Sequence, residues 1–185
     1  MRTYAFTTAI AISAAFAVQA PAPAAIHAES AANSFTAGRA YDRCTITGTR
    51  HNDVLRGTER RDVICGRGGD DVLIGRDGND RLVGQKGNDQ LRGGPGIDVL
   101  DGAAGWDVLR AGRGDDELVE GGAGHDRLYG GRGSETCLWA WNGGNNDSIR
   151  GGPGIDRYVA DARDSVSSAK EKYDDNCGPI GTPLP

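Results

Sequence analysis

Apolar and polar side chains along most of this chain follow a pattern with a period of nine residues. The clearest stretch runs from Gly66 to Arg110 and consists of the blocks GRGGDDVLI, GRDGNDRLV, GQKGNDQLR, GGPGIDVLD and GAAGWDVLR. Every block has Gly at positions 1 and 4, Asp at position 6 and Leu at position 8, while the other positions vary. A register held over five consecutive blocks indicates an internal repeat. The same register extends to twelve blocks between Gly48 and Val159.

Each block predicts a loop of six residues followed by a three-residue β-strand. Gly at positions 1 and 4 indicates backbone that turns sharply, often with a positive φ angle. Because alternate side chains of a strand share one face, position 8 is expected to point into a thin interior. Glu120 and residues 139–141 interrupt the register and are predicted to bulge out of a turn. The predicted interior residues are Leu55, Ile64, Leu73, Leu82, Leu91, Leu100, Leu109, Leu118, Leu128, Cys137, Ile149 and Tyr158.

The blocks resemble the Gly-Gly-x-Gly-x-Asp-x-U-x nonapeptide, with U a large apolar residue, of hemolysin-type (RTX) calcium-binding proteins of the secreted bacterial type. The resemblance covers residues 48–159. It implies an all-β fold: a right-handed parallel β-roll, or β-solenoid, with two nonapeptides per turn, about six turns and short capping segments. It also implies that several Ca²⁺ ions are held between consecutive turns by the position-6 Asp and by loop carbonyl groups.

With two blocks per turn, the position-6 acids form two columns, which we name after Asp71 and Asp80. Carboxylates about 4.8 Å apart repel each other by roughly 3 kcal/mol, and a divalent cation between them reverses the sign. The Asp71 column contains Asp53, Asp71, Asp89, Asp107, Asp126 and Asp147. The Asp80 column contains Asp62, Asp80, Asp98, Asp116, Glu135 and Asp156. The candidate calcium ligands are the Asp residues of both columns and the position-4 glycines Gly69, Gly78, Gly87, Gly96, Gly105 and Gly114.

Three blocks depart from the pattern. Position 4 is His51 in the first block and Arg60 in the second, and both blocks have Thr at position 2. A calcium site built only from these two loops is disfavoured, so they are predicted to form a cap. Block ten carries Glu135 in place of Asp, which disfavours a site there as well. We therefore expect roughly four to six ions.

The remaining segments predict export from the cell and closure of the roll. Residues 1–28 combine a positive N-terminal end, a short apolar run and an A-x-A motif, which are features of a secretory signal peptide. We therefore expect an extracellular protein. The apolar run is too short to span a bilayer, so no membrane span is predicted. Residues 29–47 are predicted to be a linker and N-terminal cap, and residues 160–185 a C-terminal cap and flexible tail.

Four cysteines are consistent with an oxidising compartment. Four cysteines allow three connectivities. We favour Cys44–Cys65, which would tie the N-terminal segment to the first turn, and Cys137–Cys177, which would tie the tail to the roll. Because Cys137 stands in the predicted interior, the alternative is that it is only a small apolar residue.

Composition narrows the function. The formal net charge is −5, and the arginines are spread along the repeats, so no nucleic-acid partner is predicted. The chain has no H-E-x-x-H or G-x-S-x-G motif, and few residues lie outside the repeats, so an enzyme is not expected. The leading prediction is a secreted, non-catalytic protein that folds on binding calcium. The alternative is a calcium-stabilised adhesin or a module that binds the cell wall or a polysaccharide, with Trp106, Trp139 and Trp141 as stacking candidates.

Overall fold

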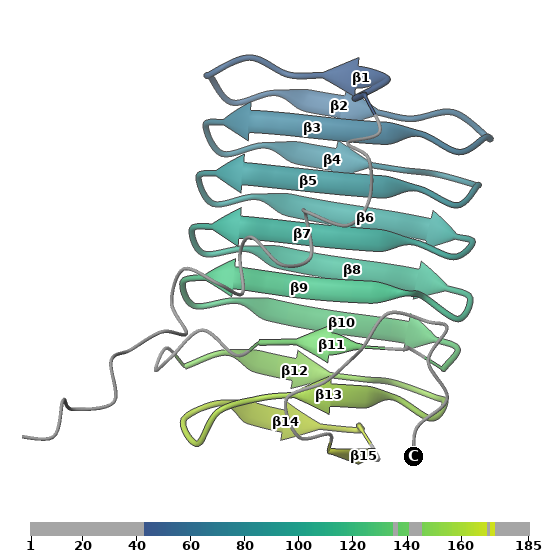
Figure 1. Cartoon of the computed structure of the whole chain (residues 1–185), viewed down its shortest axis with the longest axis vertical. Coiled ribbons are helices and arrows are strands. Elements are labelled where there is room, and N and C mark those ends of the chain that lie inside the picture. Colours follow the sequence, from purple (N-terminus) through teal and green to yellow (C-terminus); the bar gives the residue numbers. More distant parts are fainter. Residues whose placement is uncertain (1–42, 135–136, 141–145, 170, 173–185) are drawn as a thin grey trace, which may run out of the picture.

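The repeats form a stack of parallel strands. The computed structural model describes residues 43–134, 137–140, 146–169 and 171–172, and this part of the chain contains strands, turns and loops but no helix. The strands lie in two parallel sheets (Figure 1). The odd sheet consists of β1 (Ile46–Thr47), β3 (Val63–Gly68), β5 (Arg81–Lys86), β7 (Val99–Ala104), β9 (Leu118–Ala123), β11 (Leu138–Trp139), β13 (Arg157–Val159) and β15 (Glu171–Lys172). The even sheet consists of β2 (Val54–Arg56), β4 (Val72–Ile74), β6 (Gln90–Pro95), β8 (Val108–Arg113), β10 (Arg127–Arg132), β12 (Ser148–Arg150) and β14 (Ser165–Ser167).

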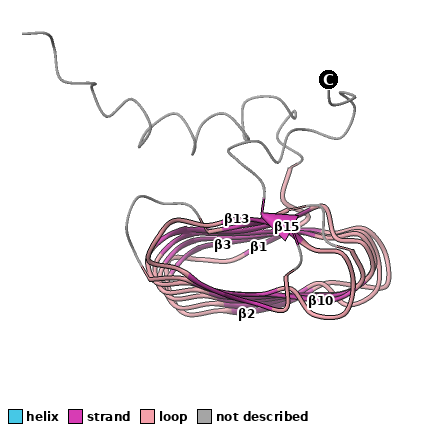
Figure 2. Cartoon of the chain, turned by 90° about the horizontal axis from the view of Figure 1, so that it is seen from below, coloured by secondary structure: helices cyan, strands magenta, loops and turns pink. Residues whose placement is uncertain are grey.

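Successive strands alternate between the two sheets, so each turn of the solenoid takes two nonapeptides. Leu82 pairs with Leu100 in the odd sheet, and Leu91 pairs with Leu109 in the even sheet, each pair being one turn apart. Seen along the stack, the sheets form two flat layers joined by loops at both edges (Figure 2). The chain is therefore an all-β parallel β-solenoid of about six turns, as the sequence predicts.

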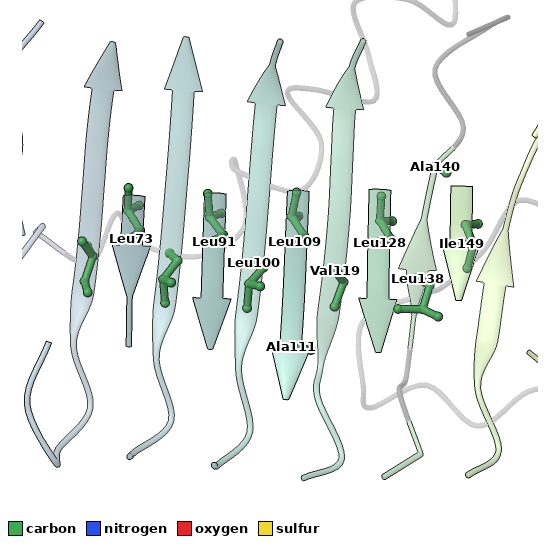
Figure 3. Close-up of a cluster of buried hydrophobic side chains, with 12 residues drawn as sticks. Leu73, Leu91, Leu100, Leu109, Ala111, Val119, Leu128, Leu138, Ala140 and Ile149 are labelled. Carbon is green, nitrogen blue, oxygen red and sulfur yellow. The ribbon is translucent and has the colours of Figure 1, made fainter. Parts of the chain in front are cut away.

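The core is a single file of apolar side chains between the two layers. Leu73, Leu91 and Leu109 come from the even sheet, Leu82 and Leu100 from the odd sheet, and all are fully buried (Figure 3). Position 8 thus faces inward as the strand period requires. Such a thin core supplies little apolar burial per residue, so backbone hydrogen bonds and loop contacts carry a large share of the stability.

Two of the predicted interior residues are wrong. Leu100 pairs with Val119 rather than with Leu118, and Val119 in turn pairs with Leu138. The interior side chains are therefore Val119 and Leu138, whereas Leu118 and Cys137 lie on the outer side of the odd sheet in a separate buried cluster. The cause is that the extra residue of this block precedes Leu118, before the strand begins.

The predicted positions of the two bulges change accordingly. The N–H of Glu117 donates to the carbonyl oxygen of Asp98 at 3.0 Å, which places the extra residue beside the loop rather than at Glu120. Glu120 pairs in register with Asp101. Trp139 is also part of a strand, and the following Ala140 is buried, so neither residue bulges outward. Trp141 lies outside the described residues.

Glycine has two different roles in the loops. Position 4 has a positive φ angle, for example 119° at Gly87 and 144° at Gly105, as predicted. Position 1 does not, and its glycine is required instead by lack of space for a side chain. Position 2 also has a positive φ angle even when it is not glycine, as at Arg67 and Gln85, which the sequence did not indicate.

The N-terminal end of the roll is fastened covalently. Cys44 and Cys65 form the predicted disulfide, with their Cα atoms 5.9 Å apart. Cys177 lies outside the described residues, so the Cys137–Cys177 bridge stays a prediction. The predicted signal peptide and most of the 29–47 segment also lie outside the described residues. The described part of the chain contains no helix long and apolar enough to cross a membrane.

Candidate metal centre

The position-6 carboxylates are linked to each other through the backbone. From Asp71 to Asp147 in one column and from Asp80 to Asp116 in the other, Oδ1 of the Asp accepts a hydrogen bond from the backbone N–H of the Asp one turn earlier. The distances are 2.7 Å from Asp71 N to Asp89, 2.7 Å from Asp89 N to Asp107 and 2.8 Å from Asp80 N to Asp98. This hydrogen-bond ladder places both predicted columns in register.

The second oxygen of the same carboxylates has no partner. Although these side chains are at most 2% exposed, their Oδ2 atoms accept no hydrogen bond in the described part of the chain. A buried carboxylate oxygen without a donor is costly, so a run of such atoms calls for a bound positive group. The residues with an unpartnered buried Oδ2 are Asp71, Asp80, Asp89, Asp98, Asp107, Asp116, Asp126 and Asp156, which lacks a partner on Oδ1 as well.

In most blocks the position-1 glycine lies beside the unpartnered oxygen and leaves no room for a Cβ atom. A methyl group added at Gly84 would collide with Oδ2 of Asp89 and lie 2.9 Å from the carbonyl oxygen of Gly102, one turn further on. In the other column, a methyl group at Gly93 would collide with Oδ2 of Asp98 and lie 2.7 Å from the carbonyl oxygen of Ala111. Position 1 is therefore glycine because a carboxylate oxygen and a backbone carbonyl oxygen both come close to it.

Carboxylate and carbonyl oxygens placed together suit a hard divalent cation. Ca²⁺ prefers oxygen ligands from these two kinds of group, and both lie next to the position-1 glycine. The described residues contain no group of three or more His, Cys, Asp or Glu side chains that could hold a metal ion. Each site would therefore depend on carbonyl oxygens to complete the coordination, which is why the loops must pack closely against each other.

Electrostatics indicates how unfavourable the columns are without a cation. Burial, with a contribution from the neighbouring column carboxylates and against the effect of the backbone hydrogen bonds, raises the pKa of Asp89 and Asp98 from the ordinary 3.8 to about 6. The same causes raise the pKa of Asp107 and Asp116 to about 7. These carboxyl groups thus resist ionisation unless a positive charge is close.

The two ends of the Asp71 column are closed differently. Oδ2 of Asp53 accepts hydrogen bonds from the backbone N–H and the hydroxyl group of Thr49, at 2.6 and 2.8 Å, and these bonds lower the pKa of Asp53. At the other end, Oδ1 of Asp164 accepts the N–H of Asp147 at 3.0 Å, while Oδ2 accepts the N–H of Asp161 at 2.7 Å. Both terminal carboxylates are therefore satisfied by the protein itself.

The Asp80 column begins in the same way. Oδ2 of Asp62 accepts the N–H and hydroxyl group of Thr58 at 2.7 and 2.9 Å. The position-2 Thr thus satisfies the second carboxylate oxygen in each of the first two blocks, and their role as a cap stays a prediction. The predicted continuation of this column through Glu135 lies outside the described residues.

A second ladder of hydrogen bonds, at position 5, was not predicted. Oδ1 of Asn52 accepts the N–H of Asp70 at 2.9 Å, Oδ1 of Asp70 accepts the N–H of Asn88 at 2.7 Å, and Oδ1 of Asn88 accepts the N–H of Trp106 at 2.8 Å. This ladder ends at Trp106, which is 65% exposed and packs edge-to-face on His125. The signal in the sequence was the frequent Asn or Asp at position 5.

The fold consists of two flat parallel sheets joined by stacked Gly-Asp loops. The loops place unpartnered carboxylate oxygens next to carbonyl oxygens at regular intervals. These features are those of a cation-binding repeat protein. The profile of the RTX calcium-binding nonapeptide repeat matches the chain at residues 47–82, 83–118 and 114–137. The chain belongs to this repeat family through these residues, and the repeats of the family bind calcium. No curated protein matches the sequence.

Proposed function

We propose that this chain is a secreted, non-catalytic protein whose loops bind several Ca²⁺ ions and which folds on binding them. The observation that carries the proposal is the unpartnered, buried Oδ2 of the central column carboxylates, which lies with a backbone carbonyl oxygen beside the position-1 residue. A cation that binds only the folded roll adds its binding free energy directly to stability.

The expected number of ions is based on pairs of carboxylates one turn apart. Pairs in which both residues have an unpartnered Oδ2 number three in the Asp71 column, from Asp71 to Asp126, and two in the Asp80 column, from Asp80 to Asp116. We therefore expect roughly four to six Ca²⁺ ions per chain. Asp53 and Asp62 are assigned to the cap because Thr already occupies their second oxygen.

Secretion is supported by the sequence of residues 1–28, and by the Cys44–Cys65 disulfide, which favours an oxidising compartment. An extracellular setting also supplies calcium only after export, so the chain would remain unfolded until it reached the outside. N-terminal sequencing of the protein recovered from the medium tests this part of the proposal. Detection of the full-length chain inside the cell and none outside would contradict it.

The test of calcium-dependent folding is a titration. The purified chain without residues 1–28 is treated with chelator and followed by circular dichroism while calcium is added, and the number of ions is measured by isothermal calorimetry. We expect β signal to develop with calcium and several ions to bind. A chain that is equally folded in excess chelator, or that binds no ion or a single ion, would disprove the proposal.

A further inference from the structure

Five of the arginines that are spread along the sequence lie together on one side of the roll. Strands of the even sheet bury position 8 and expose positions 7 and 9. We name the outward side of this sheet the arginine face; it carries Arg56, Arg92, Arg110, Arg127, Tyr129 and Arg150. The strand segments of this sheet in the described chain contain no Asp or Glu, so the face is cationic although the chain as a whole has a net charge of −5.

The opposite layer differs in kind. On the outward side of the odd sheet, Asp101 and Glu120 lie side by side in register, next to the buried cluster around Leu118. The two layers are visible on opposite sides of the roll in Figure 2. The positive charge of the arginine face is thus a property of one layer and not of the repeat in general.

Most of the arginines on this face lie along one straight row. Arg92, Arg110, Tyr129 and Arg150 all occupy position 9 of successive even strands, and the register aligns them. Neighbouring strands are about 4.8 Å apart, so the row from Arg56 on β2 to Arg150 on β12 is about 24 Å long. None of the five arginines forms a salt bridge with a residue that the structure describes.

Tyr129 orders the centre of this row. The guanidinium carbons of Arg110 and Arg150 lie 5.0 and 5.9 Å from the centre of its ring, which is cation–π distance. The two guanidinium groups are therefore held on the sheet, while their N–H donors remain available to an anion. Planar guanidinium groups bind carboxylate, sulfate and phosphate oxygens in a bidentate manner.

A shallow hollow runs beside the row. Gly94, Gly112 and Gly131 pair in register across β6, β8 and β10, and lack side chains that would fill the space next to position 9. The hollow is lined by these glycines and, on its far side, by Arg113 and Arg132. A linear ligand lying along the roll axis would thus meet arginines on both sides.

We propose that the arginine face binds a linear anionic polysaccharide lying along the axis of the roll. Side chains in this straight row recur about every 4.8 Å, which is close to the length of one sugar ring. The arginines of the row are one or two such steps apart, because Ile74 and Tyr129 occupy the other places. This spacing matches a polymer that carries an anion on each ring. Nucleic acid is disfavoured because the only aromatic ring of the face, Tyr129, is already in contact with two guanidinium groups, which leaves no ring for base stacking. A membrane is disfavoured because Val54, at one end, is the one large apolar side chain exposed on the described face.

This inference rests on the proposed function, since the face exists only when the roll is folded. The experiment uses the calcium-saturated chain and chondroitin sulfate oligosaccharides, which are linear and carry an anion on each ring. Binding is measured by calorimetry for the wild type, for the triple variant Arg92→Gln, Arg110→Gln and Arg150→Gln, and for a control, Arg43→Gln, Arg50→Gln and Arg60→Gln. The control changes the charge equally, at exposed arginines of the N-terminal segment and first two loops.

We expect the wild type to bind, the face variant to bind about tenfold more weakly, and the control to retain at least half of the affinity. Neutral dextran should not bind. Equal loss in both variants, no binding by the wild type, or tighter binding to single-stranded DNA or phosphatidylglycerol vesicles would overturn the proposal. A wild type that gains β signal with calcium but does not bind the oligosaccharide contradicts this inference alone; a wild type that fails to gain it contradicts the proposed function.

Discussion

Replacing Asp89 by Asn separates the two tasks of a column carboxylate. Oδ1 of Asp89 accepts the backbone N–H of Asp71 at 2.7 Å, and the amide oxygen of Asn can accept the same bond. The substitution removes only the negative charge and the unpartnered Oδ2. We therefore expect Asp89→Asn to stabilise the calcium-free roll and to weaken calcium binding, two effects of opposite sign.

The size of the first effect follows from the pKa. Burial, with a further contribution from Asp71, raises the pKa of Asp89 from 3.8 to about 6 in the folded roll. Each pKa unit corresponds to about 1.4 kcal/mol, so an ionised Asp89 at pH 7 destabilises the calcium-free roll by about 3 kcal/mol. Repulsion between carboxylates about 4.8 Å apart is of the same order. Because Asn buries a new N–H donor, we expect a net gain of about 1 to 3 kcal/mol.

The assay measures both states of the same protein. In excess chelator, the trimethylamine N-oxide concentration needed to reach half of the β signal reports the stability of the calcium-free roll, because this osmolyte favours burial without binding a metal site. In calcium, the midpoint of the titration reports affinity. We expect Asp89→Asn to fold at a lower osmolyte concentration and to need at least tenfold more calcium.

Asp53→Asn is the matched control. Oδ2 of Asp53 is already held by the N–H and hydroxyl group of Thr49, which lower its pKa, so removal of this charge should not stabilise the calcium-free roll and should leave the calcium midpoint nearly unchanged. If Asp89→Asn destabilised the chelated chain, the buried charge would not be what opposes folding. If the variant bound calcium like the wild type, Oδ2 would not be a ligand.

Three further predictions follow from the same geometry. Burial raises the pKa of the column carboxyl groups, so protonation stabilises the calcium-free roll. This stabilisation is present below about pH 4 and is lost as the pH rises through about 6 to 7. Acidification of the chelated chain should therefore increase its β signal in circular dichroism. Gly84→Ala should raise the calcium midpoint at least tenfold in the same titration, because the methyl group would displace Oδ2 of Asp89. Gly68→Ala, with no atom nearer than 3.7 Å, should change it by less than twofold. Cys44→Ser should cost about 3 kcal/mol of unfolding free energy in calcium, measured by urea denaturation, because it opens a loop with a sequence separation of 21; an unchanged midpoint would mean that the N-terminal segment contributes nothing.

The period of the repeat was enough to predict the architecture. Glycine and Asp recur at fixed positions, so an alternation of Gly-Asp loops and short strands follows from the spacing. Two nonapeptides per turn, and with them the two layers and the two acid columns, follow from the resemblance to the RTX repeat. The predicted strand length of three residues is wrong for β3 and for β5 to β10, which have six residues because the strand continues into the first three positions of the next block. The exact residue inside the roll does not follow where two apolar residues are adjacent. Leu118 and Val119 fit the interior equally well by sequence. Only the strand register decides that Val119 points inward, because Val119 pairs with the interior Leu100.

The chemistry of each carboxylate depends on one neighbour that the repeat leaves variable. Asp53 and Asp89 occupy the same position of their blocks, but Thr49 at position 2 satisfies Asp53, while Gln85 at position 2 leaves Asp89 without a donor. A hydroxyl group at position 2 is therefore a sequence signal for a capped block rather than a metal-binding one. The arginine face was not predicted for a different reason. Residues at position 9 of alternate blocks are separated in the sequence and become neighbours only in the folded roll.

The division of work between the two carboxylate oxygens explains why this fold would need its cation. Oδ1 is consumed by the backbone N–H of the previous turn, which fixes the register and the spacing of the loops. That bond also holds Oδ2 of Asp89 and Asp107 in a buried position where no protein donor reaches it. Each turn thus buries a negative charge that has no protein donor. The first and last carboxylates, Asp53 and Asp164, differ because nearby backbone N–H groups donate to their second oxygen. Calcium bound between two turns therefore favours the loop arrangement needed at the next site, since both sites depend on the same loop. Folding should then spread from the central turns toward the two ends of the roll.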